Sequence, residues 1–151
     1  MKDKTIDYAL RATWQAVAKM YNEEASKFES TMATGFALLS IDPDEGTPST
    51  SLGPRMGMEA TSLSRTLKSM EEKGLIVRKP NPEDGRGVLI YLTDFGKEKR
   101  AVSKDVVVTF NETIKERVSE NQLKSFFEVT EIINDLISSK KIFDQKEVIT
   151  N

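Results

Sequence analysis

Hydroxyl and basic side chains gather between residues 61 and 68. They are Thr61, Ser62, Ser64, Arg65 and Lys68. At 100° per residue, Thr61, Arg65 and Lys68 share one side of an α-helix, with the two serines flanking them. Arginine pairs well with guanine O6 and N7, and hydroxyls bond to several bases or to phosphates. We therefore predict a helix that reads DNA in the major groove, with Lys68 nearer the phosphates.

A second charged group follows between two β-rich runs, residues 75–79 and 88–92. The sequence between them, PNPEDGRG, holds two prolines and two glycines, which predicts a loop rather than a tight hairpin. Arg86 is the base expected at its tip, and narrow A·T-rich minor grooves attract arginine. Asp84 is expected to hold a neighbouring guanidinium by a charge-assisted hydrogen bond. The pattern predicts a β-wing that lies beside the base-reading helix.

Local signals place these side chains on a helix-turn-helix. A helix from Glu59 buries Leu63, Leu67 and Met70 on the side opposite the polar face, and Gly74 ends it. A shorter helix precedes it, for which Thr47 is the predicted N-cap, Pro48 the first residue and Gly57 the end. Pro54 falls inside this short helix and removes one backbone hydrogen bond. Two short helices joined by a glycine turn are typical of DNA-binding proteins.

Longer helices are expected on either side of this unit. Residues 6–28 show apolar side chains at three- and four-residue steps, and Ser30 or Thr31 is the predicted cap of a helix that ends near Ile41. Thr93 is the predicted cap of a helix that runs to Val118, and Ser119 with Gln122 forms a capping box for the last helix. The wide apolar stripe of residues 6–28 packs either on the domain's own core or on a second subunit, and periodicity does not decide between them. The fold class expected is mainly α with a small β-wing.

Composition excludes several other functions. The 151 residues include no cysteine and no histidine, so disulfides, thiolate or imidazole metal sites and Ser-His-Asp catalysis are absent. The sequence predicts no cofactor and no metal, and an enzyme is the least favoured reading. The net charge is −2, but residues 52–100 hold ten Lys/Arg and seven Asp/Glu, a net charge of +3, which leaves −5 for the rest. A localised basic surface suits DNA even on an acidic chain.

Membrane association is not expected either. No run of about 18 apolar residues is present, and the first ten residues are charged and lack the apolar region of a signal peptide. These features predict a cytoplasmic protein.

The combined motifs resemble the MarR family of bacterial transcription regulators. They are LKSMEEKGLIVRKP (residues 67–80), Asp84-Gly85-Arg86 and VLIYLTDFG (residues 88–96). The resemblance covers residues 6–137 and implies a homodimer whose winged lobes bind a pseudo-palindromic operator in double-stranded DNA. It implies dimerisation helices at 5–30 and 101–138 and a winged helix-turn-helix lobe at 31–100. From Ser138 on the apolar pattern dissolves, so a loose tail is expected at 139–151. One departure is Glu59, which stands where the family often has a better capping Asp or Ser.

The resemblance also implies a role for each part. By matched position, Ser62, Ser64 and Arg65 read the major groove and Arg86 the minor groove. The implied function is a repressor released by a small-molecule ligand that binds between the dimerisation helices and the lobe. Since cysteine is absent, thiol sensing is excluded and the inducer is expected to be a bound molecule. Aromatic acids, other lipophilic anions and acyl-CoA-type metabolites all remain open.

Five apolar side chains are candidates for lining that ligand pocket, although aromatic and methionine side chains at helical spacing are more often core. They are Trp14, Met20, Tyr21, Met32 and Phe36. The alternative function is a winged-helix adaptor that binds protein and not DNA, since a fold does not fix a function. An adaptor needs an exposed apolar patch on the helix or wing, whereas the face predicted here is hydroxyl and basic.

Overall fold

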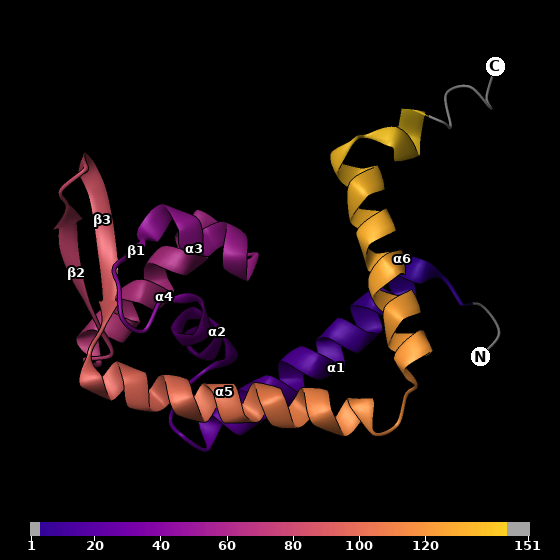
Figure 1. Cartoon of the computed structure of the whole chain (residues 1–151), viewed down its shortest axis with the longest axis horizontal. Coiled ribbons are helices and arrows are strands. Elements are labelled where there is room, and N and C mark those ends of the chain that lie inside the picture. The colour runs from indigo at the N-terminus through magenta and orange to yellow at the C-terminus, as the bar shows by residue number, and fades with distance from the viewer. Residues whose placement is uncertain (1–3, 145–151) are drawn as a thin grey trace. The chain divides into compact units, whose positions relative to one another are not determined.

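The structure, a computed structural model, describes residues 4–144, apart from the side chain of Arg86. The elements in order are α1 (Ile6–Ser26), α2 (Met32–Ser40), β1 (Thr47–Pro48), α3 (Ser49–Met56), α4 (Ala60–Glu72), β2 (Ile76–Asn81), β3 (Asp84–Leu92), α5 (Asp94–Lys115) and α6 (Glu120–Ser138) (Figure 1). The chain divides into two compact units, Met1–Val107 and Val108–Asn151. The predicted class is confirmed, because most of the described residues are helical and one small antiparallel sheet completes a winged helix-turn-helix.

The first unit has a closed apolar core, to which α2, α3, α4 and the sheet contribute. Its largest fully buried side chains are Leu38, Ile41, Leu52, Met70, Ile76 and Ile90. Leu63 and Leu67 join Met70 on the buried side of α4, as predicted. Burying an aliphatic side chain of this size stabilises the fold by roughly 1.5–3 kcal/mol. The core therefore fixes which side of α4 remains exposed.

Caps and glycines set the ends of the short helices. Thr31, rather than Ser30, caps α2, and its Oγ1 accepts a hydrogen bond from the Thr34 N–H at 3.2 Å. Gly57 ends α3 with φ of +63°, and Gly74 follows α4 with φ of +75°. Both are left-handed conformations that glycine adopts without a steric penalty. Glu59 is the N-cap of α4 but makes no side-chain capping bond, which is consistent with its poor capping chemistry.

The predicted start of α3 is wrong. Thr47 is not its N-cap but lies in β1, where it is 3% exposed and pairs with Ile90 of β3. Its Oγ1 accepts a hydrogen bond from the Asp42 N–H at 2.9 Å, so the hydroxyl serves the preceding turn. Pro48 occupies the N-cap position, and α3 begins at Ser49. The short strand β1 was not predicted.

The wing is a tight hairpin, so the predicted long loop is also wrong. The sheet order is β1-β3-β2, and β2 continues through Pro80, which pairs with Val88. Proline is tolerated there because β2 is an edge strand. Pro82 and Glu83 alone connect the strands, and the Asn81 side chain accepts a hydrogen bond from the Glu83 N–H at 3.0 Å. This turn, with a register shift after Pro80, replaces the expected loop.

The second unit holds the end of α5 and all of α6. The predicted capping box is confirmed, with Ser119 Oγ accepting from Gln122 N–H at 3.1 Å and Gln122 Oε1 accepting from Ser119 N–H at 2.8 Å. No residue of α6 is buried. The helix α5 ends at Lys115, three residues before the predicted end. Residues 141–144 are helical, and the rest of the predicted tail, 145–151, lies outside the described residues.

Within residues 4–144, no helix combines the length and the apolar character that a membrane span requires.

Candidate nucleic-acid interface and an apolar cavity

The polar face of α4 is exposed as predicted. The structure brings together five exposed side chains on this helix: Thr61, Ser62, Ser64, Arg65 and Lys68. They lie opposite the apolar stripe that joins the core. The face is narrow, polar and free of large apolar side chains, which suits contact with base edges and phosphates and disfavours a protein-binding role.

The helices α3 and α4 meet closely at the glycine turn between them. The Met58 N–H donates to the Gly53 carbonyl at 3.1 Å, and a Cβ on Gly53 would lie 3.4 Å from the Met58 oxygen. A shallow hollow between the two helices is lined in part by Ser64 and by Arg78. The geometry is that of a helix-turn-helix whose second helix is presented outward.

Arg78 is a candidate residue that the sequence did not single out. It lies on β2, its side chain is 35% exposed, and its Nε is 3.5 Å from a carboxylate oxygen of Glu71 on α4. An exposed pair of this kind contributes little stability, so the guanidinium remains available to another anion. Arg78 lies close to α4 because β2 packs beside that helix, and sequence periodicity does not predict this packing.

The wing presents a second set of polar groups. Asp84 begins β3 and is exposed, and a Cβ on Gly87 would lie 3.1 Å from its Oδ2. The backbone of Arg86 lies in β3, while its side chain is outside the described part of the chain. Lys79 lies nearby on β2 with its ammonium 5.0 Å from the centre of the Tyr91 ring. Whether Asp84 orients Arg86 therefore stays a prediction.

A tight joint connects the end of α4 to the start of α5. The Thr93 hydroxyl donates to the Gly74 carbonyl at 2.6 Å and accepts from the Gly96 N–H at 3.0 Å. The Thr93 N–H donates to the Leu75 carbonyl at 3.0 Å. A Cβ on Gly96 would overlap the Leu75 carbonyl oxygen, so only glycine permits this approach. Thr93 thus caps α5, as predicted, and also fixes the end of α4.

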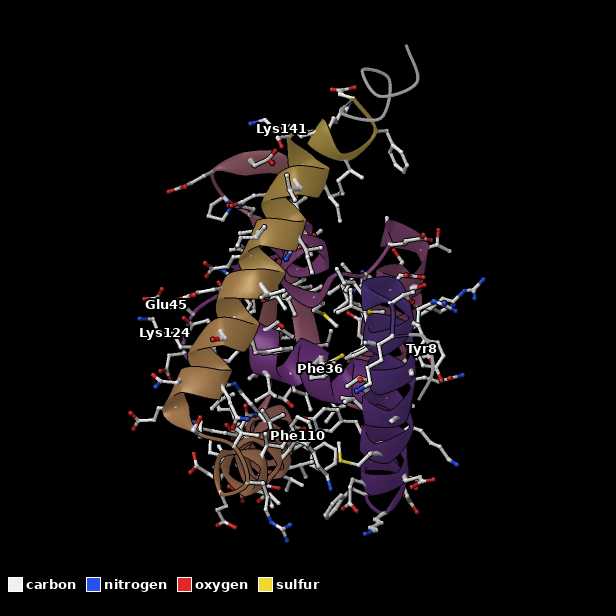
Figure 2. The ribbon with its side chains drawn as sticks, turned by 90° about the vertical axis from the view of Figure 1, so that its right-hand side faces the viewer. Tyr8, Phe36, Glu45, Phe110, Lys124 and Lys141 are labelled. Carbon is white, nitrogen blue, oxygen red and sulfur yellow. The ribbon has the colours of Figure 1, made fainter. Side chains whose placement is uncertain are left out.

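The first unit contains a largely apolar cavity of about 360 Å³. Three of the predicted pocket residues, Tyr21, Met32 and Phe36, line it. Trp14 and Met20 do not contribute to the lining, and Trp14 is 54% exposed. Phe36, labelled on α2 in Figure 2, meets the Tyr21 ring edge-on with centroids 5.5 Å apart. Burial raises the pKa of the Tyr21 hydroxyl above its ordinary value, because the apolar surroundings disfavour the charged phenolate.

Further lining comes from α5 and from the joint. On α5, Phe95, Lys99 and Val102 face the cavity, and Lys73 lines it from the C-cap of α4. The sequence alone did not single out the two lysines. The cavity therefore borders the C-terminal end of α4 as well as α1, α2 and α5.

The chain is similar to known transcription regulators. A model of the MarR family matches residues 31–88. The chain is similar to an organic hydroperoxide resistance transcriptional regulator of Bacillus subtilis (strain 168), at 35% identity over 95 residues. That match covers 61% of this chain and 65% of the relative, just under two thirds of its length.

Two solved structures share the fold. One is the complex of S. aureus MepR with DNA, with a TM-score of 0.77 and 20% identity, covering 89% of this chain and 99% of that one. The other is the PcaV transcriptional regulator from Streptomyces coelicolor in complex with its natural ligand, with a TM-score of 0.75 and 20% identity. It covers 89% of this chain and 98% of that one. At such identity the likeness establishes the fold alone.

Proposed function

Because this chain belongs to the MarR family of transcription regulators, we propose that it is a dimeric, sequence-specific repressor that a small molecule releases from DNA. Members of the family regulate transcription and are not enzymes. The winged helix-turn-helix is the DNA-binding part of the chain. The observation that carries the proposal is the exposed hydroxyl and basic face of α4, presented beside a hairpin wing.

In the proposed complex, α4 enters the major groove. Ser62, Ser64 and Arg65 contact base edges, with Thr61 beside them, and Lys68 contacts phosphates. Arg86 on the wing enters the minor groove, and Asp84 orients it. We add Arg78 as a phosphate contact, because it lines the same hollow as Ser64 and its ion-pair partner Glu71 is exposed. Phosphate contacts of this kind make affinity fall linearly with the logarithm of salt concentration.

Exposed apolar helices support the homodimer. Phe126 and Phe127 on α6 are 56% and 55% exposed, and Trp14 on α1 is 54% exposed. Tyr8 likewise projects from the outer side of α1 (Figure 2). A helix face of this kind is stable in water only when another surface covers it. We propose that residues 5–30 and 101–138 join two chains and that residues 31–100 bind DNA.

The cavity supports release by a ligand. Its volume, about 360 Å³, lies within the usual range for small-molecule sites, and its lining is mainly apolar with a few polar groups. The similar PcaV structure holds its natural ligand, which is consistent with a ligand site in this fold. We retain Tyr21, Met32 and Phe36 as ligand contacts and assign Trp14 to the dimer surface instead. Since the target is DNA, we also propose that the protein acts in the cytoplasm.

The direct test is a gel-shift titration with DNA from the protein's own promoter region. Arg65→Ala and Arg86→Ala should each weaken binding by about 1–3 kcal/mol, or roughly 5- to 150-fold. Lys19→Ala, which removes an exposed base from α1, is the matched control and should bind as the wild type does. If both arginine variants bind this DNA normally, the site assignment is wrong. If the wild type selects no duplex from a random pool at low salt, the adaptor function replaces the repressor.

A further inference from the structure

The wing has two faces, and each carries a basic side chain of β2. Ile76 and Ile90 are 1% and 0% exposed, so their side of the hairpin is the inner face, which packs on the core. Arg78 pairs with Ile90 and shares the inner face, where its Nε lies 3.5 Å from the carboxylate of Glu71 on α4. Lys79 is the next residue of β2, and successive strand residues point to opposite faces. Lys79 therefore projects from the outer face, away from α4.

The ring of Tyr91 holds the Lys79 ammonium on this outer face. Tyr91 pairs with Val77, two residues before Lys79 in β2, so the ring is a diagonal neighbour of the lysine. The Lys79 Nζ lies 5.0 Å from the ring centre, which is a cation–π contact. The ring is itself fixed, because a Cβ on Gly46 would lie only 2.6 Å from the Tyr91 Cζ. The far end of the ring thus rests on the backbone of the turn before β1.

The contact with Tyr91 leaves the positive charge of Lys79 available to an anion. Lys79 is exposed, and in the described part of the chain no carboxylate forms a salt bridge with it. A neutral ring restricts the rotamers of the lysine without neutralising the ammonium. Because ordering a long side chain on binding costs free energy, a lysine that is already held binds an anion better than an unrestrained one.

The distance of Lys79 from the wing tip places it near the phosphates of bound DNA. Lys79 pairs with Leu89, which lies three residues from Arg86 along β3. At about 3.3 Å per residue this separation is roughly 10 Å, whereas the minor groove of B-DNA is about 7.5 Å deep. When Arg86 reaches into the groove in the proposed complex, Lys79 therefore lies at the rim, which the phosphates of both strands form.

The two faces of an inserted wing meet different DNA strands, because the minor groove has one strand on each side. The inner face carries Arg78 and lies on the side of α4, so it meets the strand between the wing and that helix. The outer face carries Lys79 and meets the strand on the far side of the groove, which we call the outer strand.

We propose that Lys79 contacts a phosphate of the outer strand and that Tyr91 is the positioning residue that holds it there. This inference rests on the proposed DNA-binding function and extends it, because the wing then binds both strands that border the minor groove. Arg78 contacts one strand and Lys79 the other. A phosphate contact adds affinity and salt dependence but no preference for a base sequence.

A salt series followed by fluorescence anisotropy of a promoter duplex tests Lys79. Lys79→Gln should reduce the slope of log K against log[salt] by about 0.9 for each Lys79 in the complex, or about 1.8 for the proposed dimer. The affinity should fall by the same factor for the promoter duplex and for a random duplex of equal length. Lys19→Gln, at an exposed lysine of α1, is the control and should change neither quantity. An unchanged slope for Lys79→Gln overturns the inference.

The role of Tyr91 is tested by a double-mutant cycle. Tyr91→Leu removes the ring and should weaken DNA binding roughly two- to fivefold, whereas Tyr91→Phe keeps the ring and should bind as the wild type does. In the Lys79→Gln background, Tyr91→Leu should have no further effect, because the ring acts through the ammonium. Equal losses in both backgrounds would mean that Tyr91 has a structural role only. Lys79→Gln changes an exposed side chain, so the salt series does not depend on how the Tyr91 variants fold.

Ethylation interference on the promoter duplex identifies the strand, because ethylation removes the charge of a single phosphate. Within each half-site, the phosphates lost from the interference pattern in Lys79→Gln should lie across the minor groove from those lost in Arg78→Gln. Loss on the same strand in both variants overturns the outer-strand assignment. If the wild type binds no duplex at low salt, the proposed function fails and this inference fails with it. If the wild type binds but Lys79→Gln leaves the slope unchanged, only this inference fails.

Discussion

The winged lobe and the last helix differ in how their apolar side chains are used. In the lobe, Leu52, Met70 and Ile90 are each fully buried within one chain. In α6 no residue is buried, although Phe126 and Phe127 are as apolar as anything in the lobe core. The apolar core of the lobe is therefore closed, whereas the phenylalanines of α6 are exposed. This difference is the basis of our proposal that the lobe binds DNA and that α6 joins two copies.

The largest test of this contrast removes the exposed phenylalanines. In the proposed symmetric dimer, Phe126→Ser with Phe127→Ser removes four aromatic side chains from the interface, at roughly 1.5–3 kcal/mol each. The dimer should weaken by about 6 kcal/mol or more, which is over a thousandfold in dissociation constant. Sedimentation velocity over a dilution series measures this change. Glu131→Ser on the same helix is the control, and a double variant that sediments like the wild type would contradict the assignment of α6.

The second test substitutes a buried side chain in the core of the lobe. Met70→Ala leaves a cavity in the core and should lower the free energy of unfolding by about 2–5 kcal/mol. Urea unfolding reports this value, at a fixed protein concentration because dimerisation contributes to stability. Lys68 is an exposed residue of the same helix, so Lys68→Gln should change the free energy of unfolding by no more than about 0.5 kcal/mol. Equal losses from the two substitutions would mean that the lobe core is not closed.

The third test concerns the joint. Gly96→Ala forces a methyl group onto the Leu75 carbonyl and should destabilise the protein by about 1–3 kcal/mol. Gly85→Ala in the wing is the matched control, since a Cβ there meets no atom within 4 Å. Thermal unfolding of both variants separates the two cases. A neutral Gly96→Ala would show that α4 and α5 are not held together as described.

The smallest effect is expected at the start of α6. Ser119→Ala removes the hydrogen bond to the Gln122 N–H and should cost about 1 kcal/mol. Asn121→Ala is the control variant, because Asn121 is an exposed residue in the first turn of α6. Helix content followed by circular dichroism during urea unfolding measures the difference. Equal stability of the two variants would indicate that the capping box adds nothing measurable to α6.

Local signals made much of the lobe predictable from the sequence. The spacing of Leu63, Leu67 and Met70 located the buried side of α4, and Gly74 located its end. The Thr93 cap and the capping box of Ser119 and Gln122 were also predictable from the sequence, because a helix cap depends on residues within one turn. The exposed polar face of α4 followed directly from these assignments.

Long-range pairing limited the rest. The strand β1 forms because Thr47 meets Ile90, and neither residue signals this locally. The wing was predicted too open because Pro80 reads as a breaker, although an edge strand accepts it. The sequence does not predict the positions of Arg78 and Lys73 in these sites, because both depend on which elements pack beside them. The periodicity of residues 6–28 places Trp14 on an apolar helix face, but it does not show which surface packs against that face.

We propose that two chains, joined by their terminal helices, place two lobes on one operator. Sedimentation equilibrium of the protein with a single promoter duplex tests it most directly, because it gives the number of chains per duplex. We predict two chains per duplex for the wild type, and a large loss of affinity when Phe126 and Phe127 are both replaced by serine. One chain per duplex, with an affinity that this double substitution leaves unchanged, would contradict the account.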